Sequence, residues 1–481
     1  MASTVIKNND FMRFAQKSES YADSLSDFMS WFKARAEAAQ FDVEEIPLDE
    51  VNGWKIDLGY RGLHHQSGKF FSVQGLQVEI NEPYSQKWQQ PIINQPEIGI
   101  LGILSKKFKG VPHFLMQMKM EPGNINKAQL SPTVQATKSN YTQVHKGKLP
   151  AYLAYFLERK GTVIADQLQS EQGARFLRKR NRNMIIAIDE DIEIDENFYW
   201  LSLGQLKQLY CYDNLVNMDA RSVLSMIQLS DLNDINNLGA VDASHDFYRD
   251  LQQSIVTREE GAHRFDDLIS WFTYLKSNYA IATEIMPLSD LQDWTVSPQS
   301  ISHKEGDYFS VIGVRSKLSG REVSEWCQPL LKHDAVGLVG LLCQKINGVL
   351  HFLINARMEP GYIDVIEMGA TVSTSDPNRY QFLQQKPHFL DQFLDADKES
   401  IRCDFELSEE GGRFYHFRNR YSIVELDEAE KLPIPEGYTW LTYGQLLRFI
   451  RHSLYVNIEL RSLMSALPLS KSQSEPLPKL V

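Results

Sequence analysis

An internal repeat constrains this chain more than any other feature of its 481 residues. Trp31 has a counterpart at Trp271, and the string Met-Glu-Pro-Gly at 120–123 returns at 358–361. A motif order that is kept over most of the chain predicts two copies of one folding unit. We therefore expect a first repeat over residues 1–229, a linker over 230–263, a second repeat over 264–466 and a flexible tail over 467–481.

Each copy carries the patterns of both helices and strands. Apolar residues at helical spacing predict a first helix over 24–39, and an apolar run predicts a strand over 98–104. Ser202 followed by Gln205 is a capping box for a closing helix, and the second copy repeats it over 442–445. Helices gathered at the end of a strand-rich segment favour an α+β domain. The chain has no G-x-G-x-x-G and no P-loop, so neither a Rossmann nor an ATPase fold is expected.

Charge and composition exclude several classes of protein. The net charge of −12 argues against a nucleic-acid partner. Because no stretch approaches the roughly 18 apolar residues of a membrane helix, we expect no membrane association. Residues 1–13 lack the apolar segment of a secretory signal. The four cysteines stand alone, without C-x-x-C spacing, and indicate reduced core residues, no metal site and a cytoplasmic location.

The most informative segment is the predicted strand over 113–121. Side chains alternate across a strand, so Gln117, Lys119 and Glu121 share one face and the methionines share the other. Such a face could simply meet water. However, the order amide, cation, carboxylate is kept in the second copy, at Asn355, Arg357 and Glu359. This face is therefore a candidate site.

A polar stretch over 124–145 follows that strand. Loops on a rigid scaffold often carry binding residues, although a solvated loop remains an alternative. The second copy is degraded here, since Ser-Pro-Thr-Val-Gln-Ala-Thr at 131–137 becomes Gly-Ala-Thr-Val-Ser-Thr at 369–374. The comparison predicts one working site and one retired or modified site.

A basic element forms the third candidate. Arg175, Arg180 and Arg182 in the first copy have counterparts that include Arg413 and Arg418 in the second. Guanidinium groups suit two-pronged contacts with phosphate oxygens. Structural salt bridges are the competing interpretation for each of these arginines.

The string Glu-Pro-Gly-Asn at 121–124, with Ser-Pro-Thr-Val-Gln-Ala-Thr at 131–137, Ser-Asn-Tyr at 139–141 and His145, closely resembles the NDP-hexose 2,3-dehydratase family. The resemblance covers essentially the whole chain, including the duplication. It implies Nudix-like copies, a homodimer, a dTDP-4-keto-6-deoxyhexose substrate, no cofactor, and a downstream 3-ketoreductase in deoxysugar biosynthesis. It also implies a nucleotide-sugar pocket associated with each repeat.

The chemistry that the resemblance implies needs three roles. A base removes the hydrogen on carbon 3, which the ketone at carbon 4 acidifies; an enolate forms; and the hydroxyl on carbon 2 leaves as water. We expect Lys119 to stabilise the enolate, Glu121 or His145 to be the base, and Tyr141 to protonate the leaving group. The expected substrate-binding residues are Gln117, Asn124, Thr133, Gln135, Thr137, Asn140, Arg175, Arg180 and Arg182. The expected second pocket comprises Asn355, Arg357, Glu359, Thr371, Arg413 and Arg418.

Two other functions compete with the dehydratase. A Nudix-type nucleotide-sugar hydrolase would need the motif G-x5-E-x7-R-E-x-x-E-E-x-G, which is absent, so we expect no Mg²⁺-assisted pyrophosphate cleavage. A non-catalytic nucleotide-sugar binding protein would fit the weakened second copy. It fits poorly with the intact polar strand and loop of the first. A purely structural tandem repeat leaves the matching polar faces unexplained.

Overall fold

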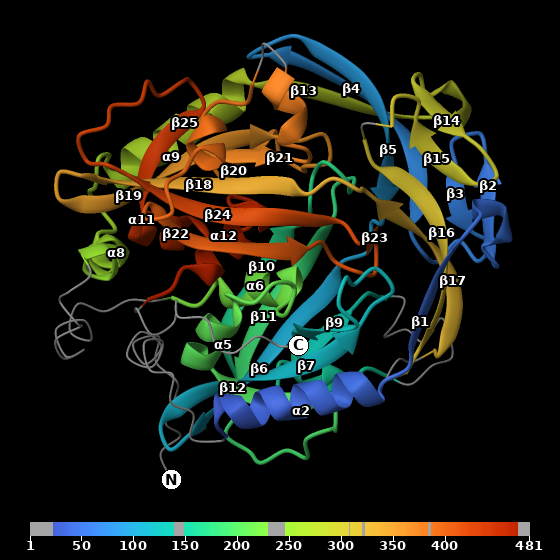
Figure 1. Ribbon diagram of the computed structural model, residues 1–481, viewed down its shortest axis with the longest axis horizontal. Helices are drawn as coiled ribbons and strands as arrows, with labels where there is room; N and C mark the ends of the chain where they lie inside the picture. The colour runs from blue at the N-terminus through green and yellow to red at the C-terminus, as the bar shows by residue number, and fades with distance from the viewer. Residues whose placement is uncertain are drawn as a thin grey trace.

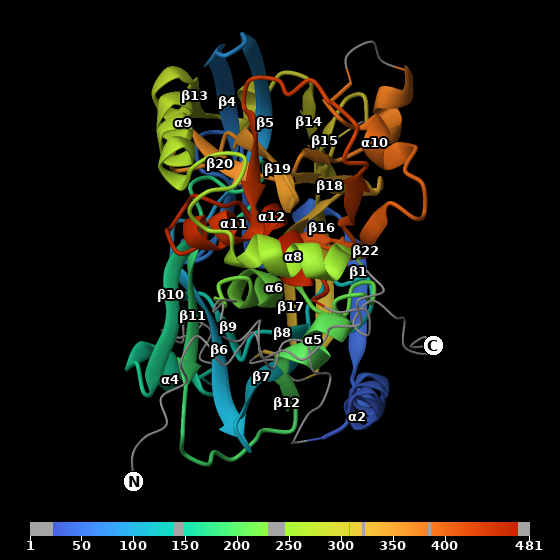
Figure 2. The ribbon, with the colours of Figure 1, turned by 90° about the vertical axis from the view of Figure 1, so that its left-hand side faces the viewer.

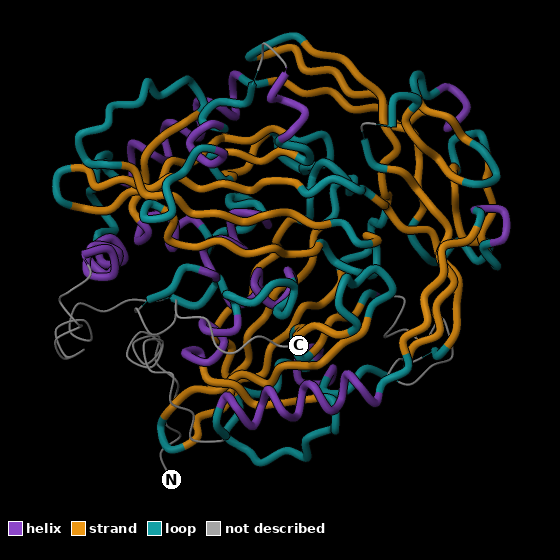
Figure 3. Tube along the Cα trace, in the orientation of Figure 1, coloured by secondary structure: helices purple, strands orange, loops and turns teal. Residues whose placement is uncertain are grey.

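The computed structural model describes residues 23–138, 149–228, 246–306, 308–319, 323–382 and 386–469. It is a mixed α/β protein in which strands predominate and short helices fill the space between the sheets (Figure 3). Among the described residues, no helix is long and apolar enough to cross a membrane.

The first repeat begins with a helix and continues through strands to two short closing helices. Its elements are α2 (Leu25–Ala38), β1 (Phe41–Ile46), η1 (Leu48–Glu50), β2 (Trp54–Asp57), β3 (Gly62–His65), β4 (Ser72–Glu82), β5 (Gln86–Asn94), β6 (Gly99–Phe108), β7 (Val111–Met120), β8 (Ala128–Ser131), β9 (Val134–Ala136), α4 (Leu153–Leu157), β10 (Thr162–Ser170), β11 (Arg180–Ala187), β12 (Phe198–Ser202), α5 (Leu203–Leu209) and α6 (Met218–Leu224).

The second repeat keeps this order among the described residues, which also include α8, η3 and β23. Its elements are α8 (Asp246–Val256), α9 (Phe265–Asn278), β13 (Ala280–Met286), η2 (Leu288–Asp290), β14 (Trp294–Val296), β15 (Ser300–His303), β16 (Ser310–Leu318), β17 (Glu325–Lys332), β18 (Gly337–Ile346), β19 (Val349–Met358), β20 (Ile366–Gly369), β21 (Val372–Thr374), η3 (Asn378–Phe382), α10 (Asp391–Leu394), β22 (Ile401–Ser408), β23 (Phe414–Tyr415), β24 (Arg418–Leu426), β25 (Tyr438–Thr442), α11 (Tyr443–Phe449) and α12 (Ile458–Ala466).

Each repeat builds one seven-stranded sheet of the same topology. In the first repeat the order is β10-β11-β6-β7-β12, with β8 and β9 pairing against the far parts of β7 and β6. In the second it is β22-β24-β18-β19-β25, with β20 and β21 in the equivalent places. The central strands β6 and β18 are buried along most of their length, which explains their near-continuous apolar sequences.

The repeats exchange a strand with each other. Strand β1 of the first repeat pairs antiparallel with β16 of the second, and β13 of the second pairs antiparallel with β4 of the first. Figure 1 shows β1 leaving α2 and running to the smaller sheet that β14 to β17 form. Each small sheet therefore contains strands from both copies, and each repeat depends on the other to complete it.

Helices from both repeats meet between the two large sheets. α6 packs against α12 at the centre of the molecule, and α8 packs against α11 on the side that faces the viewer in Figure 2. Arg461 is 1% exposed and its Nε donates to Ser222 Oγ across the contact at 2.9 Å. The largest apolar core contains side chains from both copies, which is why the repeats pack as one body.

Several elements predicted from the sequence are confirmed. The first helix starts after Ser24 with a complete capping box, and α5 and α11 have capping boxes at Ser202 and Thr442. On β7, Met116 and Met118 are buried against the core, while Lys119 lies on the other face.

Two segments differ from the predicted domain organisation. Part of the stretch expected as a linker, Asp246–Val256, is helix α8, and its Phe247, Leu251 and Ile255 are buried in the main core. The rest of the early linker, 230–245, lies outside the described residues. At the expected tail, Leu467 and Leu469 are fully buried, and the remainder, 470–481, lies outside the described residues.

Candidate active site

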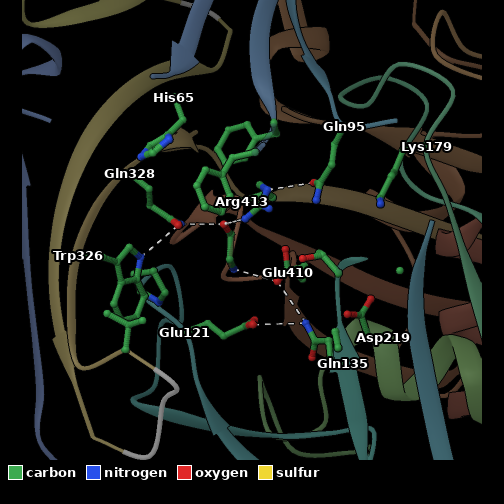
Figure 4. Close-up of a pocket in the computed structure, with 18 of the residues that line it drawn as sticks. His65, Gln95, Glu121, Gln135, Lys179, Asp219, Trp326, Gln328, Glu410 and Arg413 are labelled. Atoms are coloured by element: carbon green, nitrogen blue, oxygen red, sulfur yellow. Dashed lines mark hydrogen bonds between the residues drawn. The ribbon is translucent and has the colours of Figure 1, made fainter. Parts of the chain in front are cut away.

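A cavity of about 710 Å³ opens beside the end of β7, and both repeats line it. The first repeat contributes strand ends from its large sheet and an aromatic wall from its small sheet. The second repeat contributes β17 and the turn that links β22 to β23. Figure 4 shows side chains from the two repeats converging on the same space. The strand exchange described above positions these walls.

The polar end of the cavity is organised around a buried ion pair. Lys119 Nζ lies 3.0 Å from Glu121 Oε1, and the two side chains are 11% and 5% exposed. Gln135, on β9, donates from Nε2 to Glu121 Oε1 at 3.3 Å and is also within 3.2 Å of Glu410 Oε1. Asn217 donates to Gln135 Oε1 at 3.3 Å and orients the amide. An ammonium and two carboxyls thus meet at one amide side chain.

Three further acids surround this pair. Burial raises the pKa of the Glu410 carboxyl to about 8, and the neighbouring negative charge of Glu121 adds to the rise. Burial also raises the pKa of Asp219, on α6, well above its usual range. At the end of β10, burial raises the pKa of Glu171, and the nearby Lys179 ammonium opposes the rise. Carboxyls with raised pKa values are common in active sites.

Arg413 of the second repeat forms one side of the cavity. Its guanidinium lies 4.1 Å from the centre of the Phe71 ring, and its Nε donates to Gln95 Oε1 at 3.2 Å. Its Nη1 donates to Gly412 O at 2.6 Å, and Gln328 on β17 donates to the same oxygen at 2.8 Å. These contacts fix the turn of the second repeat against the first.

The opposite end of the cavity is aromatic. Trp54 and Phe71 pack with ring centroids 4.8 Å apart, and His65 packs edge-on against Phe70 at 4.6 Å. Trp326 closes this end from β17 and donates from Nε1 to Gln328 Oε1 at 3.2 Å. The cavity therefore has an aromatic end and an acid–base end, which suits a ligand with a planar ring and a reactive polar group.

The structure brings together four of the residues expected at the site: Lys119, Glu121, Gln135 and Thr137 all line the cavity. Asn140, Tyr141 and His145 lie outside the described residues. The other expected substrate-binding residues of the first repeat are Gln117, Asn124, Thr133, Arg175, Arg180 and Arg182. They are not among the residues that line this cavity in the described part of the chain.

The contacts of these residues explain some of the placements. The Thr133 hydroxyl accepts from Leu104 N and donates to Leu115 O, so it ties two strands of the sheet together. Arg182 makes a two-pronged ion pair with Asp166 on the neighbouring strand, at 2.7 Å for both contacts. Asn124 is buried against Gly411 of the second repeat.

The two arginines at matching positions of the repeats, Arg175 and Arg413, each extend into the other repeat. Arg413, expected in the second pocket, lines the cavity of the first repeat. Arg175 was expected in the first pocket. Its guanidinium lies 4.4 Å from the centre of the Phe309 ring of the second repeat and interacts electrostatically with Glu359. The crossing follows from the turns at 172–175 and 410–413, which each extend into the other repeat.

The remaining residues expected in the second pocket are engaged in contacts within the protein. Arg357 Nε donates to Glu359 Oε1 at 2.6 Å. Asn355 donates to the Tyr438 hydroxyl at 3.1 Å. Thr371 repeats the strand-tying contacts of Thr133, and Arg418 is ion-paired with Glu406 at 3.1 Å.

Sequence reasoning missed the acids Glu171, Asp219 and Glu410. One signal was available for two of them: an acid stands at the matching place in the second copy, at Glu409 and Glu459. Glu410 gave no such signal, because its counterpart is Gln172.

Comparison with known proteins agrees with the geometry. The family model for NDP-hexose 2,3-dehydratase matches twice, over residues 25–227 and 265–467. The chain is 42% identical over 472 residues to the dTDP-4-dehydro-6-deoxy-α-D-glucopyranose 2,3-dehydratase of Saccharopolyspora spinosa, covering 97% of this chain and 96% of the relative. It is 40% identical to the proteins of the same name from Amycolatopsis orientalis, over 93% of this chain and 91% of the relative, and from Streptomyces violaceoruber, over 91% and 96%. The chain belongs to the NDP-hexose 2,3-dehydratase family.

Proposed function

We propose that this chain removes water across carbons 2 and 3 of a dTDP-4-keto-6-deoxyhexose and forms the dTDP-3,4-diketo-2,6-dideoxyhexose. The relatives named above carry this activity in their names. The observation that carries the proposal is the buried Lys119–Glu121 pair at the polar end of a cavity whose other end is aromatic. We place the reaction in this cavity.

The two ends of the cavity orient the substrate. The thymine ring packs at the aromatic end, where Trp54 and Trp326 offer faces for stacking. The sugar then reaches the acid–base end. Arg413 lines the space between the two and supplies a positive charge along the path of the diphosphate. A volume of about 710 Å³ falls within the usual range for pockets that enclose a ligand of this kind.

Lys119 is suited to stabilise the enolate. Its ammonium has three N–H groups, of which one faces Glu121 and another lies 3.5 Å from Gln135 O. The remaining donor can reach the oxygen on carbon 4, where negative charge develops once the carbon 3 proton leaves. A fixed donor at such an oxygen contributes about a hundredfold to a thousandfold in rate.

Glu121 is suited to be the base. Its carboxylate is 5% exposed and is held by the Lys119 ammonium and the Gln135 amide, so its position is fixed before the substrate arrives. The ammonium also favours the ionised carboxylate, which is the form that a base needs. His145 remains the alternative base, and Tyr141 remains a candidate donor to the leaving hydroxyl.

The same proposal includes features that the family resemblance implies: a Nudix-like fold for each repeat, a homodimer and a downstream 3-ketoreductase. These rest on the resemblance alone, whereas the proposed cytoplasmic location rests on the isolated cysteines. The 3,4-diketo product is reactive, and a reductase acting at carbon 3 would convert it to a stable sugar.

The test is mass spectrometry of the purified protein incubated with dTDP-4-keto-6-deoxyglucose, once with Mg²⁺ and once with EDTA. We expect loss of one water at the same rate in both samples, followed by release of dTDP as the diketo sugar decomposes. Release of dTMP and a sugar phosphate only with Mg²⁺ would replace the proposal with a hydrolase. Substrate that binds but stays intact would replace it with a binding protein.

A further inference from the structure

We propose that Glu410, which the second repeat places in the cavity of the first, is the acid that protonates the hydroxyl leaving carbon 2. This inference rests on the dehydratase function proposed above and names a further residue for that reaction. It also gives the duplication a catalytic reason, because the first repeat alone does not contain this carboxyl.

Backbone contacts hold Glu410 in place. Gly123 N, just after the Lys119–Glu121 pair, donates to Gly411 O at 2.8 Å, and His416 N donates back to Gly123 O at 2.9 Å. A Cβ built on Gly123 would lie 1.5 Å from Phe414 O, so the two segments are in close backbone contact. The turn that carries Glu410 is therefore fixed directly over the end of β7.

Glu410 and Glu121 are neighbours. Gln135 Nε2 lies within hydrogen-bonding distance of both carboxyls, 3.2 Å from Glu410 Oε1 and 3.3 Å from Glu121 Oε1. Gly412 N also donates to Glu410 Oε1, at 3.1 Å. Two carboxyls this close can act on adjacent carbons of one sugar ring, one on carbon 3 and the other on the oxygen of carbon 2.

The two carboxyls differ in their surroundings. Glu121 is paired with the Lys119 ammonium, which favours the ionised form that a base needs. Burial and the charge of Glu121 raise the pKa of Glu410 to about 8, so at neutral pH Glu410 keeps the proton that an acid needs. Two carboxyls whose environments push their pKa values apart divide the roles of base and acid between them.

The proposed steps balance. Glu121 takes the proton from carbon 3, and the C–H electrons form the enolate that Lys119 stabilises. The enolate electrons then form the carbon 2–carbon 3 double bond, the carbon–oxygen bond at carbon 2 breaks, and Glu410 gives its proton to the departing oxygen. Water leaves, Glu121 returns its proton to the neighbouring Glu410, and the enol exchanges its hydroxyl proton for a proton on carbon 2 through solvent.

The second repeat provides an internal contrast. Gln172, from the first repeat, is the residue that matches Glu410 and stands at the equivalent position of the second pocket. Gln172 is buried and its Nε2 donates to Glu409. An amide has no acidic proton to give, so the second pocket lacks the group that Glu410 supplies.

The test uses Glu410→Gln in the full-length protein. This change keeps the shape of the side chain, and the chain already accepts glutamine at the matching position. In D₂O we expect the variant to place deuterium on carbon 3 of dTDP-4-keto-6-deoxyglucose within about tenfold of the wild-type rate. Loss of water should fall about a hundredfold to ten-thousandfold, the usual contribution of general acid catalysis.

A second substrate separates acid catalysis from structural damage. In the 2-deoxy-2-fluoro analogue the leaving group is fluoride, a weak base that gains little from protonation, and the product is the same diketo sugar. We expect Glu410→Gln to eliminate fluoride within about fivefold of wild type. If fluoride loss falls as far as water loss, or if carbon 3 exchange also stops, Glu410 is not the acid.

The outcomes also separate this inference from the proposed function. Wild-type protein that neither exchanges carbon 3 nor releases water contradicts the function itself. Wild-type protein that works, alongside an unimpaired Glu410→Gln, overturns only the role of Glu410. In that case Tyr141→Phe is assayed with both substrates. Tyr141 is the donor if this variant loses water slowly but eliminates fluoride at close to the wild-type rate.

Discussion

The two pockets stand on the same scaffold and differ at a few positions. In the first repeat the cation is Lys119, paired with Glu121 at 3.0 Å across an open cavity. In the second it is Arg357, whose Nε lies 2.6 Å from Glu359 Oε1 and whose Nη1 donates to Ser373 O at 3.3 Å. The guanidinium is larger than an ammonium, and two of its nitrogens donate to protein groups. Its remaining donors lie in a rigid planar fork, so it does not present a compact, freely rotating donor group to a substrate oxygen as the Lys119 ammonium does.

A second difference concerns space. Asn124 lies against Gly411 in the first repeat, and Tyr362 lies against Gly173 at the matching place in the second. Tyr362 is 7% exposed, and Asn457 donates to its hydroxyl at 3.3 Å. A buried aromatic ring thus takes room that the first pocket leaves to a smaller side chain. These differences support the proposal that the first pocket carries the catalysis while the second keeps the framework.

The largest difference in kcat is expected between substitutions of the two cations, Lys119 and Arg357. Lys119→Met should lower kcat about a thousandfold or more, because the enolate loses its stabilising donor, while the Kd for dTDP stays within about threefold. Steady-state kinetics and calorimetric titration of dTDP measure the two effects. Equal loss of binding and turnover would mean that Lys119 holds phosphate or structure.

The matching change in the second pocket, Arg357→Met, should lower kcat less than tenfold. It leaves the buried Glu359 without its partner, so the melting temperature should fall even though turnover per folded molecule is kept. A thousandfold loss of kcat in this variant would mean that the reaction takes place in the second pocket.

The next difference concerns two tryptophans. Trp326→Ala should raise KM about tenfold, since stacking on a base contributes roughly 1–3 kcal/mol and Trp326 lines the first cavity. Trp88, its counterpart on β5, makes the same kind of contact to Gln90 at 2.8 Å. Trp88→Ala should leave KM within about twofold. A larger KM effect from Trp88 would reverse the comparison.

The pH dependence should also report on one pocket. Glu410 acts in its protonated form, so kcat/KM should stay level below its pKa of about 8 and fall about tenfold per unit above it. The charged and titratable groups around it are Lys119, Glu121, Lys179, Asp219 and Arg413.

A pH control comes from the second repeat. Burial raises the pKa of Glu459 to about 8 as well, so this group could produce a similar limb if the second pocket carried the reaction. We expect Glu459→Gln to keep the limb and the 2-fluoro substrate to remove it. If Glu459→Gln abolished the fall of kcat/KM at high pH, that fall would belong to Glu459 and not to Glu410.

The smallest difference is expected where the framework is shared. A Cβ on Gly123 would lie 1.5 Å from Phe414 O, and one on Gly361 would lie 1.8 Å from Phe176 O. Gly123→Ala and Gly361→Ala should therefore each destabilise the protein by about 1–3 kcal/mol, to a similar extent. Thermal melting of both variants measures this. A clear effect in only one of them would show that the repeats do not support each other equally.

Local structure could be predicted from the sequence because its causes are local. The capping boxes at Ser24, Ser202 and Thr442 satisfy backbone donors within one turn, and the alternation on β7 follows from the geometry of a strand. Part of the site follows from the same reasoning, since Lys119 and Glu121 share a face and do line the cavity.

The contribution of the second repeat could not be predicted in this way. A period of two shows which face of a strand is buried but not which edge it pairs with, so nothing marked β1 as a partner of β16. Without that exchange, Glu410 and Trp326 belong to a distant part of the chain. The only sequence signal for Glu171 and Asp219 was the acid at the matching position of the second copy.

The central claim is that both repeats build one working pocket, in the first repeat. A crystal structure of Lys119→Met with unreacted dTDP-4-keto-6-deoxyglucose tests it most directly. We predict carbon 3 within about 3.5 Å of the Glu121 carboxylate, the hydroxyl of carbon 2 beside Glu410, and the thymine against Trp326. A sugar bound only beside Arg357 and Glu359, or one that contacts no residue of the second repeat in the first cavity, would contradict it.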